Sequence, residues 1–211
     1  MPPLLILAST SPRRRELLAI LGFPFEVIPP TSQEELRPDR STREQVRKFA
    51  LDKAQSVAPH YPHTLVLGSD TLIELDDKPV GKPRDLREAE KMLNQLLGRQ
   101  HLVHTAVALV QEEPQTRESL VETVSVWMRQ LGEQEVAEYL KTEESLGKAG
   151  AYSIQGEGAR LIERIEGDYP TIVGLPLWHT AKLLEQHGVV LPNPVEEIYR
   201  LKLYNNWKNF S

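Results

Sequence analysis

Residues 4–15 of the chain read LLILASTSPRRR. An apolar run is followed by three hydroxyl residues and then by Pro12, a residue that is favoured at the first position of a helix. The pattern predicts a strand over residues 4–8 and a helix with Ser11 as its N-cap. The start of such a helix leaves backbone N–H groups unpaired at the positive end of the helix dipole. The stretch therefore predicts an α/β protein with an anion site, and the natural anion is a phosphate.

The arginines of this stretch bear on the same prediction. Arg13 and Arg14 lie in the first helical turn, where positive charge opposes the helix dipole unless an anion compensates it. A turn directly after a strand is also a usual place for ligand binding in α/β sheets. The alternative is a solvated basic helix face, which is the ordinary explanation of such a cluster. From this stretch alone both explanations stay open.

The bulk composition limits the class of protein. The chain has 211 residues, of which 40% are hydrophobic and 26% charged, as in a globular domain or two closely joined lobes. Its net charge of −5 argues against general nucleic-acid binding. It has no cysteine, which excludes disulfides and thiolate metal sites. No apolar run approaches the roughly 20 residues of a membrane span, and no signal peptide is evident, so we expect a cytoplasmic protein without a membrane partner.

The rest of the chain alternates between helix and strand patterns. Ser41 and Glu44 form a capping box, and Asp85 with Glu88 caps a further helix. Two strand patterns flank a polar loop around Pro114 and predict a hairpin, so the sheet should be mixed. Asp76–Pro79 predicts a turn, and the tail after Val190 is weakly patterned. The expected helices are 12–21, 42–58, 85–98, 133–140 and, as the last one, 175–186; the expected strands are 4–8, 25–28, 64–75, 102–110, 118–128 and part of 152–165.

One expected strand contains an acidic residue. Residues 64–75 read TLVLGSDTLIEL, a strand that we expect to be interrupted or bent at Gly68–Thr71. Burying Asp70 in such a strand without partners costs several kcal/mol. The carboxylate could accept backbone N–H bonds at a bulge. Alternatively, it is a metal ligand or a general base on a rigid element.

Other charged residues are weaker candidates. Lys82 lies between Gly81, which allows close approach of a ligand, and Pro83, but most loop lysines are merely solvated. Lys53 is by default a surface lysine of its helix. Glu34 and Glu35 lie in a polar loop, and only Asp70 makes a divalent cation shared with them a reasonable hypothesis.

Residues 147–156 read GKAGAYSIQG, and their small residues suit a backbone that wraps around a planar ligand. Gln155 offers an amide donor and acceptor, the complement of a base edge. The alternative is a glycine-rich turn whose glutamine caps its own backbone. The sequence has no paired histidine spacing for zinc, no P-loop and no Gly-x-Ser-x-Gly elbow.

Taken together, these segments resemble the Maf family of nucleoside triphosphate pyrophosphatases. The resemblance runs from residue 4 to about 188. It implies a mixed α/β fold, Maf/inosine triphosphatase-like, with flanking helices and two lobes around a cleft. We expect a single catalytic domain over 1–190 with a tail over 191–211, and a homodimer is possible. The motifs that carry the resemblance are STSPRR at 9–14, GSDT at 68–71, GKP at 81–83, AGAYSIQG at 149–156 and VGLP at 173–176.

The resemblance also implies a reaction. It is hydrolysis between the α- and β-phosphates, which releases a nucleoside monophosphate and pyrophosphate with a divalent cation, magnesium or manganese. Asp70 resembles the general base, and Glu34 falls where a family acid assists catalysis, both being metal ligands. The loop around Glu34 is less acidic than in the family, so Glu35 is an alternative. The implied substrate-binding residues are Ser9, Ser11, Arg13, Arg14, Lys53, Thr71, Lys82 and Gln155.

The segment around Gln155 bears on the substrate. Its form, AYSIQG, resembles the branch that acts on dTTP and UTP, whereas the 7-methyl-GTP branch tends to carry phenylalanine and an acidic residue. A neutral amide can pair with the O4/N3–H edge of uracil or thymine. The expected function is therefore dTTP and UTP hydrolysis, for nucleotide-pool housecleaning. The alternatives are a pyrophosphatase for 7-methyl-GTP or a broad range of non-standard nucleotides, and a non-catalytic nucleotide-binding regulator of cell division.

Overall fold

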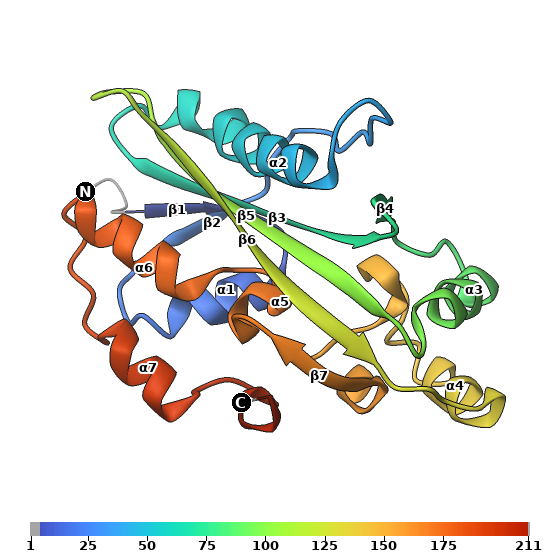
Figure 1. The fold of residues 1–211 in the computed structure, drawn as a ribbon. Coiled ribbons are helices and arrows are strands. Elements are labelled where there is room, and N and C mark those ends of the chain that lie inside the picture. The colour runs from blue at the N-terminus through green and yellow to red at the C-terminus, as the bar shows by residue number, and fades with distance from the viewer. Residues whose placement is uncertain (1–4, 211) are drawn as a thin grey trace.

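A computed structural model describes residues 5–210, which form one mixed seven-stranded sheet with helices on both faces (Figure 1). The strand order is β2-β1-β3-β5-β6-β7, and β4 pairs with β3 off this path. β1 runs parallel to β2 and β3, and the other pairings are antiparallel, which confirms the mixed α/β sheet and the hairpin. Leu4, the first residue of the predicted strand, lies outside the described residues. The strands are β1 (Leu5–Ala8), β2 (Glu26–Ile28), β3 (Leu65–Leu75), β4 (Lys78–Val80), β5 (Gln100–Gln111), β6 (Thr116–Met128) and β7 (Ile162–Glu166).

The helices begin where the capping residues predict. Ser41 Oγ accepts from the backbone N–H of Glu44, and the Glu44 carboxylate accepts from that of Ser41, which confirms the capping box. The predicted helix over 175–186 is not the last, because another helix follows it. In residues 5–210 no helix has the length and apolar character needed to cross a membrane. The helices are α1 (Pro12–Ala19), α2 (Thr42–Val57), α3 (Leu86–Leu96), α4 (Glu133–Leu140), α5 (Tyr169–Val173), α6 (Leu177–Gln186) and α7 (Val195–Leu201).

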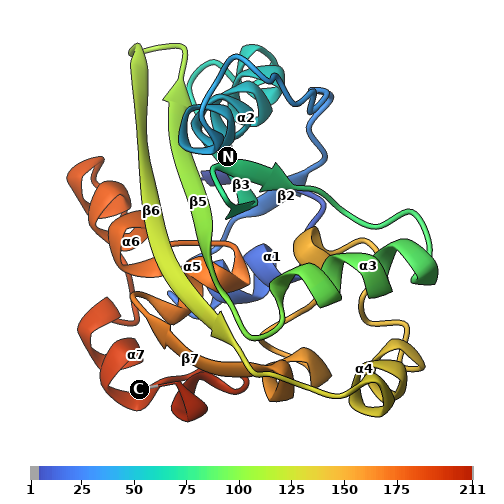
Figure 2. The ribbon, with the colours of Figure 1, turned by 45° about the vertical axis from the view of Figure 1, so that its right-hand side comes forward.

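The sheet separates two hydrophobic cores. The helix α2 covers one face, and α1, α5 and α6 cover the other (Figures 1 and 2). Because successive side chains of a strand point to opposite faces, β1 contributes to both cores. Leu5 and Leu7 belong to the larger core with α1 and α6, whereas Ile6 and Ala8 pack against α2. An apolar run that is buried on both sides is what a central strand requires.

The strand β3 carries the GSDT motif without a break. It pairs with β5 in one continuous register from Val66 to Glu74, so the predicted interruption at Gly68–Thr71 is wrong. The Asp70 carboxylate bonds to a side chain, as described below, and therefore needs no bulge. The glycine allows a close approach to α2, since a Cβ at Gly68 would lie 2.2 Å from the carbonyl oxygen of Ala50.

One side of β3 is only partly covered by strands. It pairs with β1 over Leu65–Gly68 and with β4 over Ile73–Leu75. Residues 69–72 therefore have no strand partner on that side. The predicted turn is shorter than expected, because only Asp76 and Asp77 have positive φ and residues 78 and 79 already belong to β4. The edge left open by β1 and β4 is where a ligand can approach this sheet.

The segment after residue 190 is folded against the rest of the chain. It contains α7 and a 3-10 turn at Trp207–Asn209. Val195, Ile198 and Trp207 are buried in the larger core. The weak pattern in the sequence did not predict this packing, which depends on contacts with distant parts of the chain.

Candidate active site

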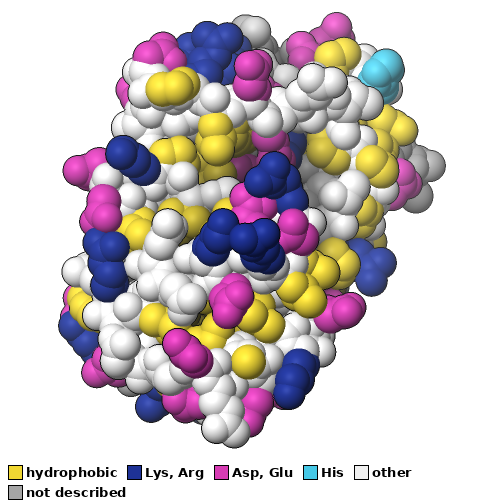
Figure 3. All heavy atoms as spheres, turned by 90° about the vertical axis from the view of Figure 1, so that its right-hand side faces the viewer, with side chains coloured by type: hydrophobic (Ala, Val, Ile, Leu, Met, Phe, Trp, Pro, Cys, Tyr) yellow, Lys and Arg dark blue, Asp and Glu magenta, His cyan; other side chains and the backbone are white. Residues whose placement is uncertain are grey.

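A cavity of about 450 Å³ opens beside the uncovered stretch of β3. Figure 3 shows Lys and Arg side chains gathered around a hollow in the middle of this face, with acidic side chains among them. All ten residues predicted from the sequence line this cavity, although they come from six separate parts of the chain. They are Ser9, Ser11, Arg13, Arg14, Glu34, Lys53, Asp70, Thr71, Lys82 and Gln155.

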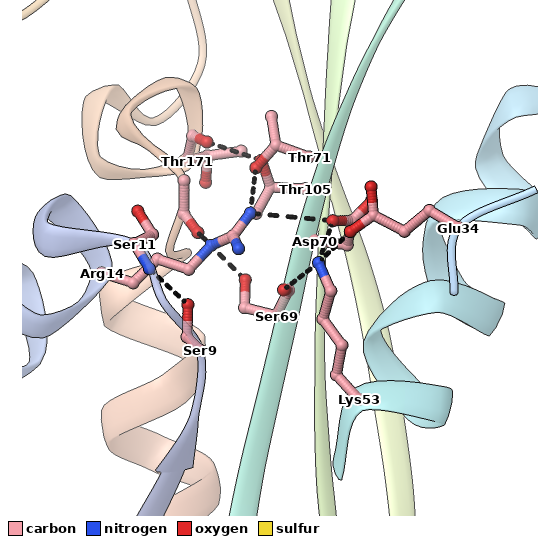
Figure 4. A network of polar contacts seen from close by, with 11 residues as sticks. Ser9, Ser11, Arg14, Glu34, Lys53, Ser69, Asp70, Thr71, Thr105 and Thr171 are labelled. Atoms are coloured by element: carbon pink, nitrogen blue, oxygen red, sulfur yellow. Dashed lines mark hydrogen bonds and ion pairs between the residues drawn. The ribbon is translucent and has the colours of Figure 1, made fainter. Parts of the chain in front are cut away.

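A lysine joins two carboxylates at the floor of the cavity (Figure 4). Lys53 Nζ lies 2.5 Å from Asp70 Oδ1 and 2.6 Å from Glu34 Oε1, and it also donates to the carbonyl oxygen of Ser69 at 3.4 Å. Lys53 is only 7% exposed, so its default assignment as a surface lysine is wrong. Three acceptors compensate its burial. Between Glu34 and Glu35, it is Glu34 that joins this cluster.

The pKa values of the two carboxylates are shifted in opposite directions. Burial raises the pKa of Asp70, and Glu34 raises it further, against the opposing charges of Lys53 and Arg14. Burial also acts to raise the pKa of Glu34, but the hydrogen bond and charge of Lys53 outweigh it and lower that pKa. Asp70 Oδ2 is buried and has no hydrogen-bond partner within residues 5–210. The site therefore holds one free carboxylate oxygen that can accept a proton.

Arg14 is fixed by the protein itself. Its Nε donates to the carbonyl oxygen of Gly174 at 2.9 Å, and its Nη2 donates to Thr71 Oγ1 at 3.3 Å and lies 3.9 Å from Asp70 Oδ1. Burial lowers its pKa, and the charge of Asp70 acts in the opposite direction. An arginine held on three sides in this way is a rigid part of the wall beside the carboxylates.

The Thr71 hydroxyl is part of the same network. Thr105 Oγ1 donates its single proton to the carbonyl oxygen of Thr171 at 2.7 Å. In the 3.0 Å contact between the two threonine hydroxyls, Thr71 must therefore be the donor. Its proton is then unavailable to a phosphate oxygen, and Thr71 holds Arg14 by accepting from it.

Three cationic side chains of the cavity are available to bind a ligand. Arg13, Lys82 and Lys148 line the cavity, and in the described part of the chain none of them has a hydrogen-bond or ion-pair partner. Burial lowers the pKa of Lys148, and the positive charges of Arg13 and Lys82 lower it further. Such mutual repulsion is relieved by a polyanion. Lys148 was missed as a site residue, and its signal was its place in the glycine-rich segment.

The first turn of α1 adds backbone donors to this wall. Ser11 is its N-cap, as predicted, but the serine side chain makes no capping bond, and the first turn of this fully described helix has no acidic residue. The backbone N–H of Ser11 instead donates to Ser9 Oγ at 3.1 Å, which leaves the Ser9 hydroxyl proton free to donate. The start of α1 is thus open to an anion.

Gln155 lines the same cavity. Its Oε1 is buried and without a partner within residues 5–210, so it does not cap its own backbone. The loop around it is fixed by Glu144, whose carboxylate accepts from the backbone N–H groups of Glu157 at 2.8 Å and Gly158 at 3.0 Å. Beside it, the Tyr152 hydroxyl lies 2.7 Å from His101 Nε2. An unpaired carbonyl on a fixed loop is an acceptor for a ligand N–H.

The acidic residues fit a cation that arrives with a ligand. Within residues 5–210 no group of three or more His, Asp or Glu side chains could hold a metal ion. Asp70 and Glu34 offer two carboxylates, with Asp70 Oδ2 unpaired. Mg²⁺ binds in this way to one or two carboxylates when phosphate oxygens and water complete its octahedron.

The chain is similar to several curated proteins. It is 43% identical over 183 residues to a dTTP/UTP pyrophosphatase of Vibrio parahaemolyticus, with 86% of this chain and 96% of that protein aligned. It is 46% identical over 186 residues to a dTTP/UTP pyrophosphatase of Symbiobacterium thermophilum, with 87% and 94% aligned. Among solved structures, the Staphylococcus aureus Ham1 protein aligns with a TM-score of 0.43 and 19% identity, over 59% of this chain and 71% of that one. The family model described as Maf-like protein matches residues 4–187, and the chain therefore belongs to the Maf family.

Proposed function

We propose that this protein hydrolyses UTP and dTTP to the nucleoside monophosphate and pyrophosphate. The activity named for the relatives supports this proposal. The structural observation that supports it most is the pair of carboxylates bridged by Lys53. The pair leaves Asp70 Oδ2 free, and it faces a wall of uncommitted cations. An anion site alone would need only the cations. A buried carboxylate with one unpaired oxygen would weaken anion binding, and it is useful where a proton must be accepted.

In the proposed mechanism, Asp70 orients a water molecule and accepts its proton on Oδ2. The water oxygen attacks the α-phosphorus, the bond from this phosphorus to the bridging oxygen breaks, and pyrophosphate leaves with the bond electrons. Its negative charge is stabilised by Arg13, Lys82 and Lys148 and by the N-terminus of α1. Lys53 holds the other Asp70 oxygen, so the carboxylate cannot rotate away from the water. Burial raises the pKa of Asp70 and so makes it a stronger base.

A divalent cation is part of this proposal. Asp70 and Glu34 are the residues that would hold magnesium or manganese, which would supply positive charge to the triphosphate. The remaining ligands would come from the nucleotide and from water.

We assign recognition of the nucleobase to Gln155. Its unpaired Oε1 would accept from N3–H of uracil or thymine, while the amide NH₂ can donate to O4. Cytosine offers an acceptor at N3 and a donor at the exocyclic amine, so it would oppose the same amide orientation. The predicted preference is therefore for UTP and dTTP over CTP.

The test is a product analysis with UTP, dTTP, CTP and 7-methyl-GTP, each with Mg²⁺ or Mn²⁺. We expect UMP and pyrophosphate from UTP, and in ¹⁸O-labelled water the label should enter UMP, because the α-phosphorus is attacked. The variant Asp70→Asn should lower turnover by about 10²-fold or more, whereas Asp52→Asn, at a partly exposed residue paired with Lys48, should not.

Three outcomes would contradict the proposal. Release of UDP and phosphate would place the attack at another phosphorus. A preference for 7-methyl-GTP would refute the assignment of nucleobase recognition to Gln155. Binding of UTP without product release would favour a non-catalytic nucleotide-binding regulator.

A further inference from the structure

The C-terminal segment, residues 191–210, lies outside the family match, which ends at residue 187. It is nevertheless anchored at several points. The Tyr199 hydroxyl donates to Asp168 Oδ1 at 2.7 Å. Trp207 is 4% exposed, and its ring lies over that of Tyr169 with centroids 5.8 Å apart and an interplanar angle of 14°. These contacts bring the chain end back to the body that carries the cavity, below β7 in Figure 1.

One residue of this segment grips the loop that presents Gln155. Asn206 has φ 62°, and its Nδ2 donates to the carbonyl oxygens of Ile154 at 3.2 Å and Gly156 at 3.3 Å. These two carbonyls flank Gln155 in the chain. The grip is itself supported, because the Tyr169 hydroxyl donates to the carbonyl oxygen of Asn205 at 2.5 Å. A side chain that binds both neighbours of Gln155 restricts where its amide can point.

The same segment also contacts α1. The Tyr204 hydroxyl donates to Glu16 Oε2 at 2.6 Å, and Glu16 follows Arg13 by one helical turn. Burial lowers the pKa of Arg13, and the negative charge of Glu16 acts in the opposite direction. The segment therefore contacts both the helix that carries Arg13 and the loop that carries Gln155.

We infer that the C-terminal segment determines nucleobase selectivity, with Asn206 as the positioning residue for Gln155. The inference rests on the proposed function, because that function assigns nucleobase recognition to Gln155. The buried Trp207 ring, stacked on Tyr169, already attaches the segment to the fold. The two bonds of Asn206 go instead to the loop with the unpaired amide carbonyl, where they set the direction of an acceptor.

Two substitutions at Asn206 test this. Asn206→Gly removes the side chain and keeps the positive φ without strain. Asn206→Asp puts an oxygen in place of the NH₂ that faces two carbonyls, which turns attraction into repulsion. The matched controls are Asn205→Gly and Asn205→Asp, since the neighbouring Asn205 is exposed and its side chain makes no hydrogen bond within residues 5–210.

The readout is the ratio of kcat/KM for UTP to that for CTP. We expect both Asn206 variants to lower the ratio about tenfold, with Asn206→Asp the lower of the two. The change should come from a higher KM for UTP, with kcat within about twofold of wild type, because the carboxylates bridged by Lys53 are untouched. Both Asn205 variants should keep the wild-type ratio and the wild-type melting temperature.

The inference is overturned if the ratio stays at its wild-type value, or if the UTP and CTP values fall in parallel, as a merely structural role requires. If Asn206→Asp does not fold, Asn206→Gly carries the test alone. A wild-type protein that binds but does not hydrolyse UTP contradicts the proposed function. The ratio of Kd for CTP to that for UTP, measured by calorimetry, then decides the role of Asn206 by the same criterion.

Discussion

Replacing Lys53 with methionine should move the acid limb of the pH–rate profile to higher pH. The substitution keeps the apolar stem but removes the ammonium group between Asp70 and Glu34. The lysine charge lowers the pKa of both carboxylates, so its loss must raise both. A general base works only when ionised, and a base with a higher pKa stops working at a higher pH.

The size of the shift follows from the geometry. Lys53 Nζ lies 2.5 Å from Asp70 Oδ1 and 2.6 Å from Glu34 Oε1, so the substitution removes a positive charge in direct contact with both carboxylates. A cation this close lowers the pKa of a carboxyl group by about 1–3 units. The acid limb should therefore move by about one pH unit or more.

The assay is kcat/KM for UTP between pH 4 and 9 at saturating Mg²⁺. Lys48→Met is the matched control, because Lys48 is an exposed lysine of the same helix that pairs with Asp52. We expect the Lys53 variant to lose activity about one pH unit earlier on acidification, with a lower plateau, while the control follows wild type. An acid limb that stays in place or moves to lower pH would refute the assignment of Asp70 as the base.

Four further predictions follow from the same structure. Asp70→Asn should lower kcat by about 10²-fold or more while nucleotide binding persists. Because burial raises the pKa of Asp70, its ionised form destabilises the fold at every pH above that pKa, so the same variant should melt higher than wild type at pH 7; retained turnover or a lower melting temperature would contradict this. Glu34→Gln should shift the acid limb of the pH–rate profile to lower pH, since the Glu34 charge raises the pKa of Asp70; a shift to higher pH would contradict this role of Glu34. In calorimetry, Mg²⁺ should bind the free protein more weakly than it binds the complex with a non-hydrolysable UTP analogue, because the cavity supplies only two carboxylates with a lysine between them; equal affinities would indicate a resident metal site. Gly68→Ala should lower the free energy of unfolding by about 2 kcal/mol or more in a denaturant titration, because the new Cβ would lie 2.2 Å from the carbonyl oxygen of Ala50 in α2; an unchanged midpoint would mean that the helix can move away.

Local patterns in the sequence predicted most elements well. The capping box at Ser41 and the cap at Asp85 set the starts of α2 and α3, because a cap is an interaction between residues three positions apart. The hairpin β5–β6 was equally visible as two alternating runs around a polar loop. The prediction for β3 was wrong, because Asp70 suggested an interruption of the strand. A single sequence does not reveal the ion pair with Lys53 that makes a regular strand tolerable there.

The candidate site shows the same division. Its ten predicted residues all line one cavity, eight of them from motifs and Glu34 and Lys53 from the family resemblance alone. The separate tasks of these residues depend on distant contacts. Arg14 and Arg13 are neighbours in the sequence, yet only Arg14 is bound by Gly174 and Thr71. Lys53 resembled any surface lysine, since its burial depends on two carboxylates from other segments. The predicted homodimer and cytoplasmic location stay predictions.

The contacts that close the cavity have a consequence for protein synthesis. Arg14 is held by Gly174, 160 positions away, and Glu16 by Tyr204, 188 positions away. A nascent chain emerges N-terminus first, so α1 leaves the ribosome long before Gly174 and Tyr204 have been synthesised. Contacts of such long sequence separation also form slowly. A chain that is terminated before residue 174 thus lacks the contacts that hold Arg14 and Glu16, and we expect it to lack a closed cavity.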